Sequence, residues 1–82
     1  MHWIREVKYI KDYLLEITFD DNTIKIVDLK HYVGGNGIFK PLQNIDYFKK
    51  VKKDSFSNTI CWDNGADICP DVLYSSGKTM EQ

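Results

Sequence analysis

The 82-residue sequence predicts a small α+β domain, in which short helices pack on a small antiparallel sheet. Three observations support this prediction. Strand-like runs follow one another on short connections, short helical segments separate them into two groups, and no long helix joins neighbouring strands as in β-α-β units. The predicted order is β-β-β-α-α-β-β-α. We expect one domain over residues 1–77 and a frayed tail over residues 78–82.

The clearest element is a strand over residues 13–19, in which apolar and polar side chains alternate. Successive side chains of a strand point to opposite faces, so the apolar set is expected to form a buried face. This set comprises Tyr13, Leu15, Ile17 and Phe19. A weaker strand is expected over residues 3–10, and a third, rich in β-branched residues, over residues 23–27. Asn22 tolerates positive φ and suits the intervening turn.

Short helices are expected after the third strand. Asp28 is placed to cap a helical turn over residues 29–32, because its carboxylate can accept bonds from the free amides there. Asn44 is placed in the same way before a helix over residues 45–50. Both caps therefore mark the start of a short helix.

A glycine-rich stretch over residues 34–37 lies between these helices and precedes an apolar segment over residues 38–42. Glycine permits positive φ and loses much entropy on ordering, so we expect a mobile loop tip. The stretch lacks the lysine-serine or lysine-threonine ending of a phosphate-binding loop. A loop that becomes ordered on a partner is the alternative.

The C-terminal half predicts two more strands, over residues 51–56 and 58–62, joined by a turn at residues 55–58. Pro70 suits the first position of a helix, and Gly77 suits its end. The second group of elements is therefore β-β-α.

Composition excludes several classes of protein. The chain has 11 basic and 12 acidic residues, a net charge of −1 and a pI near 6.0, whereas nucleic-acid-binding domains commonly have a pI above ~9. No apolar run approaches the ~20 residues needed to span a bilayer. The N-terminus lacks the apolar core of a signal peptide, so we expect a cytoplasmic location and free thiols at Cys61 and Cys69.

The charges are unevenly distributed along the chain. A basic group lies between residues 40 and 54: Lys40, Lys49, Lys50, Lys52 and Lys53. An acidic group follows: Asp63, Asp67, Asp71 and Glu81. Such a dipolar surface favours a charged protein partner or self-association.

Residues 59–74 form the most distinctive block, with the sequence TICWDNGADICPDVLY. It resembles the C-terminal signature of the small bacterial family called domain of unknown function 2442. The matching residues are Trp62, Asn64, Gly65, Ala66, Asp67, Pro70, Leu73 and Tyr74. Supporting landmarks are the segments 13–22, 27–29 and 39–42, followed by Phe48; Asn22 stands where the family usually has glycine.

The resemblance implies a compact α+β fold and mainly structural roles for the matching residues. It implies no established activity. Family members often lie in gene pairs that resemble toxin–antitoxin modules, which suggests a partner-binding protein. Some longer relatives add a C-terminal helix-turn-helix domain, and we expect this chain to be a single-domain member without it.

Catalytic and metal sites have little support in the sequence. His31 follows Asp28 by three residues, so one helical turn could orient it as a general base, or it is a surface histidine beside a capping aspartate. Asp63, Asp67 and Asp71 repeat every four residues, but Gly65 and Pro70 interrupt any single helix that would present them together. We expect no catalytic residues, metal or cofactor.

The sequence therefore predicts a non-catalytic protein-interaction domain, antitoxin-like or inhibitor-like, of bacterial or phage origin. The predicted partner surface comprises Ile38, Phe39, Lys49, Lys50, Lys52 and Lys53. One alternative is a nucleic-acid-associated protein that uses the lysine-rich edge with the aromatic residues Tyr47, Phe48 and Phe56. A small enzyme is a further alternative. A homodimer across an edge strand is also compatible with the sequence, and a membrane association is not expected.

Overall fold

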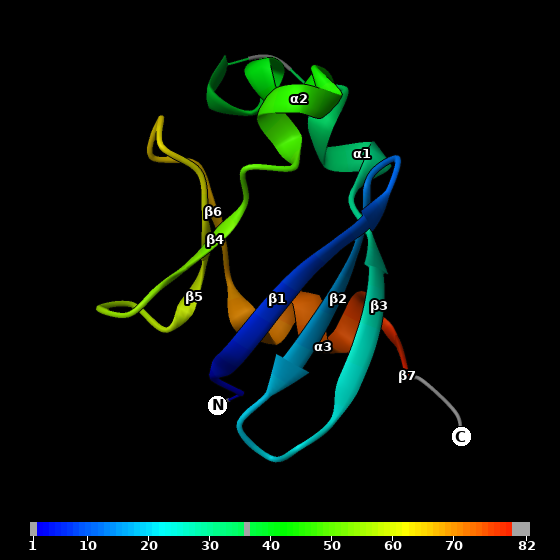
Figure 1. Cartoon of the computed structure of the whole chain (residues 1–82), viewed down its shortest axis with the longest axis vertical. Helices are drawn as coiled ribbons and strands as arrows, with labels where there is room; N and C mark the ends of the chain where they lie inside the picture. The colour runs from blue at the N-terminus through cyan, green and yellow to red at the C-terminus, as the bar shows by residue number, and fades with distance from the viewer. Residues whose placement is uncertain (1, 36, 80–82) are drawn as a thin grey trace.

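Two antiparallel sheets and four short helical segments contribute to one core in the computed structural model, which describes residues 2–35 and 37–79 (Figure 1). The first part of the chain forms β1 (Ile4–Lys11), β2 (Leu14–Phe19), β3 (Ile24–Asp28), α1 (Lys30–Val33), the 3₁₀ helix η1 (Gly37–Gln43) and α2 (Ile45–Phe48). The second part forms β4 (Lys52–Asp54), β5 (Thr59–Cys61), β6 (Asp67–Ile68), α3 (Pro70–Ser76) and β7 (Lys78–Thr79). The predicted α+β class is confirmed.

The first sheet has the strand order β1-β2-β3-β7. Asp12 and Asn22 lie in its two tight turns with φ of 49° and 70°, so both adopt the left-handed conformation that aspartate and asparagine tolerate. The role expected for Asn22 is thus confirmed. Register shifts interrupt β1 between Ile4 and Glu6 and between Tyr9 and Lys11; such irregularities make an outer strand a poorer template for further pairing.

The predicted core face of β2 is confirmed. Leu15, Ile17 and Phe19 have fully buried side chains. Tyr13 lies just before the strand and is half-buried, because its ring packs edge-on against Phe48 while its hydroxyl donates to the carbonyl of Gln43. The alternation of apolar and polar residues in β2 therefore identifies the side of the sheet that faces the core.

The helical segments between residues 30 and 48 gather at one end of the molecule (Figure 1). Asn44 caps α2 as predicted, with its Oδ1 accepting from the amide of Asp46 at 2.9 Å. The cap predicted for α1 needs correction, because the residue at the N-cap is Leu29. Asp28 still belongs to β3, so its carboxylate reaches past Leu29 and accepts from the amide of Lys30 at 3.0 Å.

The single sheet expected from the sequence is replaced by two. The second sheet has the order β4-β5-β6, and β6 lies where no strand was predicted. Thr59 and Ile60 of β5 are buried, and Ile60 pairs with Ile68 of β6. A strand of two residues has too little alternation to be recognised locally, so its pairing depends on the packing of β5.

Helix α3 begins at Pro70 and ends before Gly77, as predicted. Gly77 has an extended conformation, and its role is steric: a Cβ there would lie 2.9 Å from both Lys25 Cβ and Val27 Cγ2. The chain then pairs Lys78 and Thr79 with β3. The tail expected to fray from residue 78 is therefore ordered through residue 79, and residues 80–82 lie outside the described residues.

The core draws on nearly every element. Its buried apolar residues are Ile4, Leu15, Ile17, Phe19, Val27, Leu29, Val33, Leu42, Phe48, Ile60, Trp62, Ala66, Ile68 and Leu73. No helix in the described part of the chain is long and apolar enough to cross a membrane. The core thus joins the two sheets, and it fixes the loops at the end where α1, η1 and α2 gather.

Candidate functional site

The signature block closes the second sheet against the helical end of the molecule. Trp62 is buried, and its indole Nε1 donates to the backbone carbonyl of Phe48 at 2.9 Å. The rings of Phe48 and Trp62 lie 5.7 Å apart. A buried indole N–H needs such a partner, because an unpaired buried donor is costly. Trp62 therefore positions the end of α2 relative to β5.

Residues 63–65 form a tight turn, here called the signature turn. Gly65 has a φ of +92°, and its amide donates to the carbonyl of Trp62 at 3.0 Å. Asn64 uses both ends of its side chain: Oδ1 accepts from the amide of Ala66 at 3.1 Å, and Nδ2 donates to the carbonyl of Ile38 at 2.8 Å. The turn is thus bonded directly to η1.

The remaining signature residues have structural surroundings. Ala66, Pro70 and Leu73 are buried. Tyr74 donates its hydroxyl hydrogen to Asp21 Oδ2 at 3.0 Å and stacks on the ring of His2, with centroids 3.6 Å apart. Asp67 is exposed on β6, and no side-chain hydrogen bond joins it to any described residue.

The lysine edge, defined as Lys49, Lys50, Lys52 and Lys53, runs from the end of α2 into β4 and is exposed. Lys52 Nζ lies 2.7 Å from Asp63 Oδ1, so the edge is bonded to the signature turn. The hydrogen bond from Lys52 holds the pKa of Asp63 below its usual value, and the same bond raises the pKa of Lys52. Lys49 lies 3.4 Å from Asp46 on α2.

Ile38 and Phe39, the apolar members of the predicted surface, have different environments. Ile38 is 46% exposed, and its Cδ1 lies beside Gly65 of the signature turn. Phe39, also in η1, is half-buried and packs against the core, with its ring centroid 6.0 Å from that of Tyr32. The sequence predicted an exposed apolar contact formed by both residues, but only Ile38 is available for it.

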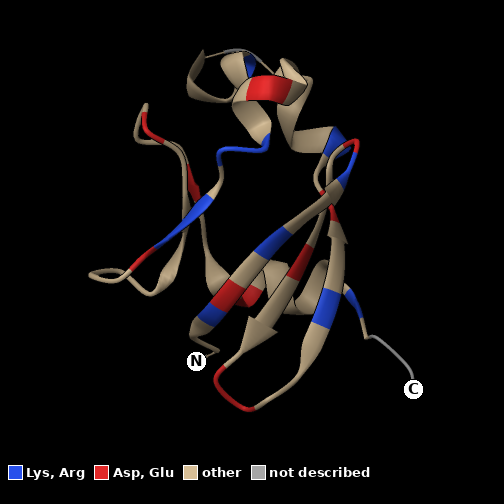
Figure 2. Ribbon diagram, in the orientation of Figure 1, with Lys and Arg blue, Asp and Glu red and all other residues tan. Residues whose placement is uncertain are grey.

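The signature turn brings the two halves of the predicted surface together. Asn64 contacts Ile38 on one side, and Asp63 contacts Lys52 on the other. Acidic residues consequently lie among the basic ones rather than on a separate face (Figure 2). This corrects the simple dipolar layout expected from the sequence, in which Asp63 belonged to a distant acidic group; Glu81 lies outside the described residues.

A further exposed residue was not assigned to the partner surface from the sequence. Phe56 is 95% exposed at the tip of the β4–β5 hairpin. The sequence pattern extended the fourth strand to residue 56, but β4 ends at Asp54. The signal that identifies the tip is the succession Asp54, Ser55, Phe56, Ser57 and Asn58, in which polar turn residues surround one aromatic.

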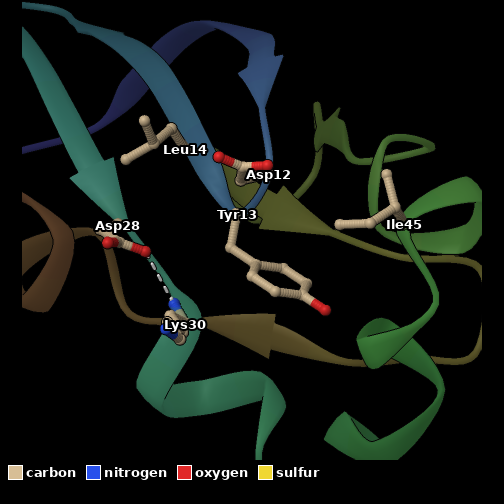
Figure 3. Close-up of a pocket in the computed structure, with 6 residues that line it drawn as sticks. All are labelled: Asp12, Tyr13, Leu14, Asp28, Lys30 and Ile45. Carbon is tan, nitrogen blue, oxygen red and sulfur yellow. Dashed lines mark hydrogen bonds between the residues drawn. The ribbon is translucent and has the colours of Figure 1, made fainter.

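The hollow in Figure 3 has a volume of about 460 Å³ and lies between the β1–β2 turn and the helical end. Its lining residues are Asp12, Tyr13, Leu14, Asp28, Lys30 and Ile45. The carboxylate of Asp28 already accepts the Lys30 amide (Figure 3). The hollow offers apolar contact and mixed charge, and its lining contains no cysteine, serine or histidine nucleophile.

His31 and the aspartates at 63, 67 and 71 do not converge on a site. His31 is exposed on α1, and no hydrogen bond joins it to Asp28. Asp71 instead accepts from the amide of His2 at 3.0 Å, which lowers its pKa. Within residues 2–35 and 37–79, no three His, Cys, Asp or Glu side chains are grouped to hold a metal ion.

Both cysteines are free thiols in the structure. Burial raises the pKa of the Cys61 thiol. A raised pKa leaves less of the reactive thiolate at neutral pH.

Fold and site together define a small α+β domain whose signature turn ties an apolar residue to a lysine edge. The family model described as "Protein of unknown function (DUF2442)" matches residues 4–79, and the chain belongs to this family. The resemblance inferred from the signature block is thereby confirmed. No match was found among curated proteins or among solved structures.

Proposed function

We propose that this domain is a non-catalytic protein-interaction module, antitoxin-like or inhibitor-like, that binds a protein partner through Ile38 and the lysine edge. The observation that carries the proposal is the signature turn, which holds these two exposed features side by side through Asn64 and Asp63. A small apolar contact with a charged rim is a common form of protein-binding surface. Phe39, the next residue after Ile38, packs against the core and so anchors this part of η1.

The pairing of the lysines favours a protein over a nucleic acid as the partner. Lys49 and Lys52 each have an aspartate within 4 Å, so half of the lysine edge is already partly neutralised. Nucleic-acid binding depends on unpaired positive charge that displaces counterions from phosphates. Lys50 and Lys53 make no ion pair with any described residue and remain available to carboxylates of a protein partner.

The proposal is tested by co-purification from extracts of the native organism. The tagged protein is compared with the double variant Lys50→Glu, Lys53→Glu. A second double variant, Lys11→Glu, Lys30→Glu, changes the net charge equally at exposed lysines away from the edge. We expect a protein that the wild type and the control variant retain, and that the edge variant loses.

Two results would contradict the proposal. Equal retention of every captured protein by both double variants would show that the edge is not the binding surface. Binding to oligonucleotides that weakens by about a decade or more between low and moderate salt would favour the nucleic-acid-associated alternative.

A cytoplasmic location and a homodimer across an edge strand remain predictions from the sequence.

A further inference from the structure

Phe56 is the most exposed large hydrophobic side chain among the described residues. Its exposure is 95%, whereas the other exposed large hydrophobic residues range from 37% to 46%. A phenylalanine in this position gains nothing from the core of its own domain. Aromatic side chains that stand clear of the surface are typical contacts at the centre of protein interfaces, where burial provides the driving force.

The turn that presents Phe56 is already ordered. Asp54 Oδ1 accepts from the amide of Phe56 at 3.2 Å, and Asp54 Oδ2 accepts from the hydroxyl of Ser57 at 2.7 Å. The amide of Asn58 donates to the carbonyl of Asp54 at 2.8 Å, and Asn58 has a φ of +58°. Because the backbone is held before any partner arrives, binding does not require the turn to be ordered again.

The hairpin is also bonded to the rest of the domain on both arms. The amide of Ile4 donates to the carbonyl of Asn58 at 2.9 Å, which joins the hairpin to the start of β1. On the other arm, Lys52 is bonded to Asp63. The hairpin, whose first strand carries Lys52 and Lys53 of the lysine edge, is therefore held on both arms, and it lies on the side of the molecule away from β3 (Figure 1).

We infer that Phe56 is the inserted contact of the protein-binding surface, and that it enters an apolar pocket on a protein partner whose rim carries carboxylates. This inference rests on the proposed function. The charge of the rim follows from β4, where Lys52 and Lys53 precede Asp54, the last residue before the turn. Lys53 has no ion pair with a described residue, and Asp54 is satisfied within the turn. A partner carboxylate would therefore meet unpaired positive charge as Phe56 becomes buried.

The first part of the test uses the tagged full-length protein and two substitutions at one position, Phe56→Ala and Phe56→Trp. Ile10→Ala is the matched control, because Ile10 is 44% exposed on β1 in the other sheet. Circular dichroism verifies that each variant folds, which is expected since Phe56 contributes little to the core. Native extracts are applied as for the lysine-edge variants, and bound proteins are quantified by mass spectrometry.

We expect one protein to be retained by the wild type and Ile10→Ala, reduced at least about tenfold with Phe56→Ala, and restored with Phe56→Trp. That protein is then purified and cross-linked to a variant with a benzophenone amino acid at position 56. We expect the cross-link to lie in an apolar pocket bordered by Asp or Glu residues. The inference is supported only if retention of the protein depends on Phe56 and the cross-link lies in such a pocket.

Several outcomes would overturn the inference. If Phe56→Ala retains the protein that Lys50→Glu, Lys53→Glu loses, the hairpin is not inserted although the proposed function stands. If the cross-link lies on a basic or flat polar surface, the stated chemistry is wrong. If Phe56→Ala instead abolishes binding to oligothymidine, Phe56 stacks on bases. If substitutions in the lysine edge and at Phe56 all leave the retention of every captured protein unchanged, the proposed function fails and this inference fails with it.

Discussion

The indole Nε1 of buried Trp62 donates to the carbonyl of Phe48 at 2.9 Å. This bond joins the two points at which the lysine edge and the signature turn begin. The lysine edge begins one residue after Phe48, and the signature turn begins one residue after Trp62. Phe48 also packs edge-on against the rings of Tyr9 in β1 and of Tyr13 in the turn between β1 and β2. The Phe48–Trp62 pair therefore links both halves of the candidate surface to the core.

Trp62→Phe is expected to destabilise the protein by about 2–4 kcal/mol. The substitution removes one of the two donors to the Phe48 carbonyl, which keeps the amide of Val51 at 3.1 Å, and it leaves part of the indole volume empty. Urea unfolding followed by circular dichroism measures the change. Trp3→Phe is the matched control, since Trp3 is 40% exposed, and it is expected to change stability by less than about 0.5 kcal/mol. Equal effects of the two substitutions would contradict the role of Trp62.

Ile17→Ala tests the core face of β2. Ile17 is fully buried, so its truncation loses the transfer free energy of the removed atoms and opens a cavity. We expect a loss of about 2–5 kcal/mol, which is a large part of the stability of so small a domain. Thermal unfolding provides the measurement, with Ile10→Ala as an exposed reference. A melting temperature unchanged within a degree or two would show that the assignment is wrong.

The elements with the longest patterns could be predicted, and the shortest could not. The apolar alternation of β2 and the Asn44 cap describe local preferences, and both are confirmed. Strands β6 and β7 have two residues each, so they depend on pairing with strands elsewhere in the chain. The position of Lys25 also depends on a residue distant in the sequence. Lys25 pairs with buried Ile17, and its ammonium group lies 4.6 Å from the centre of the Tyr74 ring.

The candidate site could be predicted in part. The lysine edge and Ile38 follow from charge and apolar runs, but the contacts that join them through Asn64 span 26 residues of chain. Phe39 was expected in the exposed anchor but packs against the core, whereas Phe56 was not assigned to the partner surface and is exposed. Whether an aromatic residue is covered depends on what packs over it, and a hairpin tip has no neighbouring element to cover Phe56.

Gly77→Ala is expected to destabilise the protein by about 1–3 kcal/mol. The added methyl group would lie 2.9 Å from Lys25 Cβ and Val27 Cγ2, so α3 must move away from β3. Gly34→Ala is the control, because the nearest atom to its Cβ is a carbonyl oxygen at 3.9 Å and its φ is −77°. Denaturant unfolding should show little change for the control. A tolerated Gly77→Ala would indicate that β7 is not closely packed on β3.

The order of the Phe56 hairpin is expected to depend on pH through Asp54. The hydroxyl of Ser57, and then the amide of Phe56, donate to the Asp54 carboxylate and hold its pKa below the ordinary value of 3.8. A carboxyl whose pKa is lowered by folding stabilises the folded state above its unfolded pKa. That stabilisation is lost as the pH falls through the folded value. The two hydrogen bonds to the Asp54 side chain should therefore be present at neutral pH and weakened in acid.

The measurement is an NMR titration of the Phe56 amide chemical shift, which reports directly on the hydrogen bond to Asp54 Oδ1. We expect a midpoint below 3.8 in the wild type and a midpoint closer to 3.8 with Ser57→Ala, because that variant removes the larger of the two stabilising bonds. Asp54→Asn should abolish the transition, since the amide does not titrate. A wild-type midpoint at or above 3.8 would show that these bonds do not form in solution, and Phe56 would then be presented on a turn that must be ordered when a partner binds.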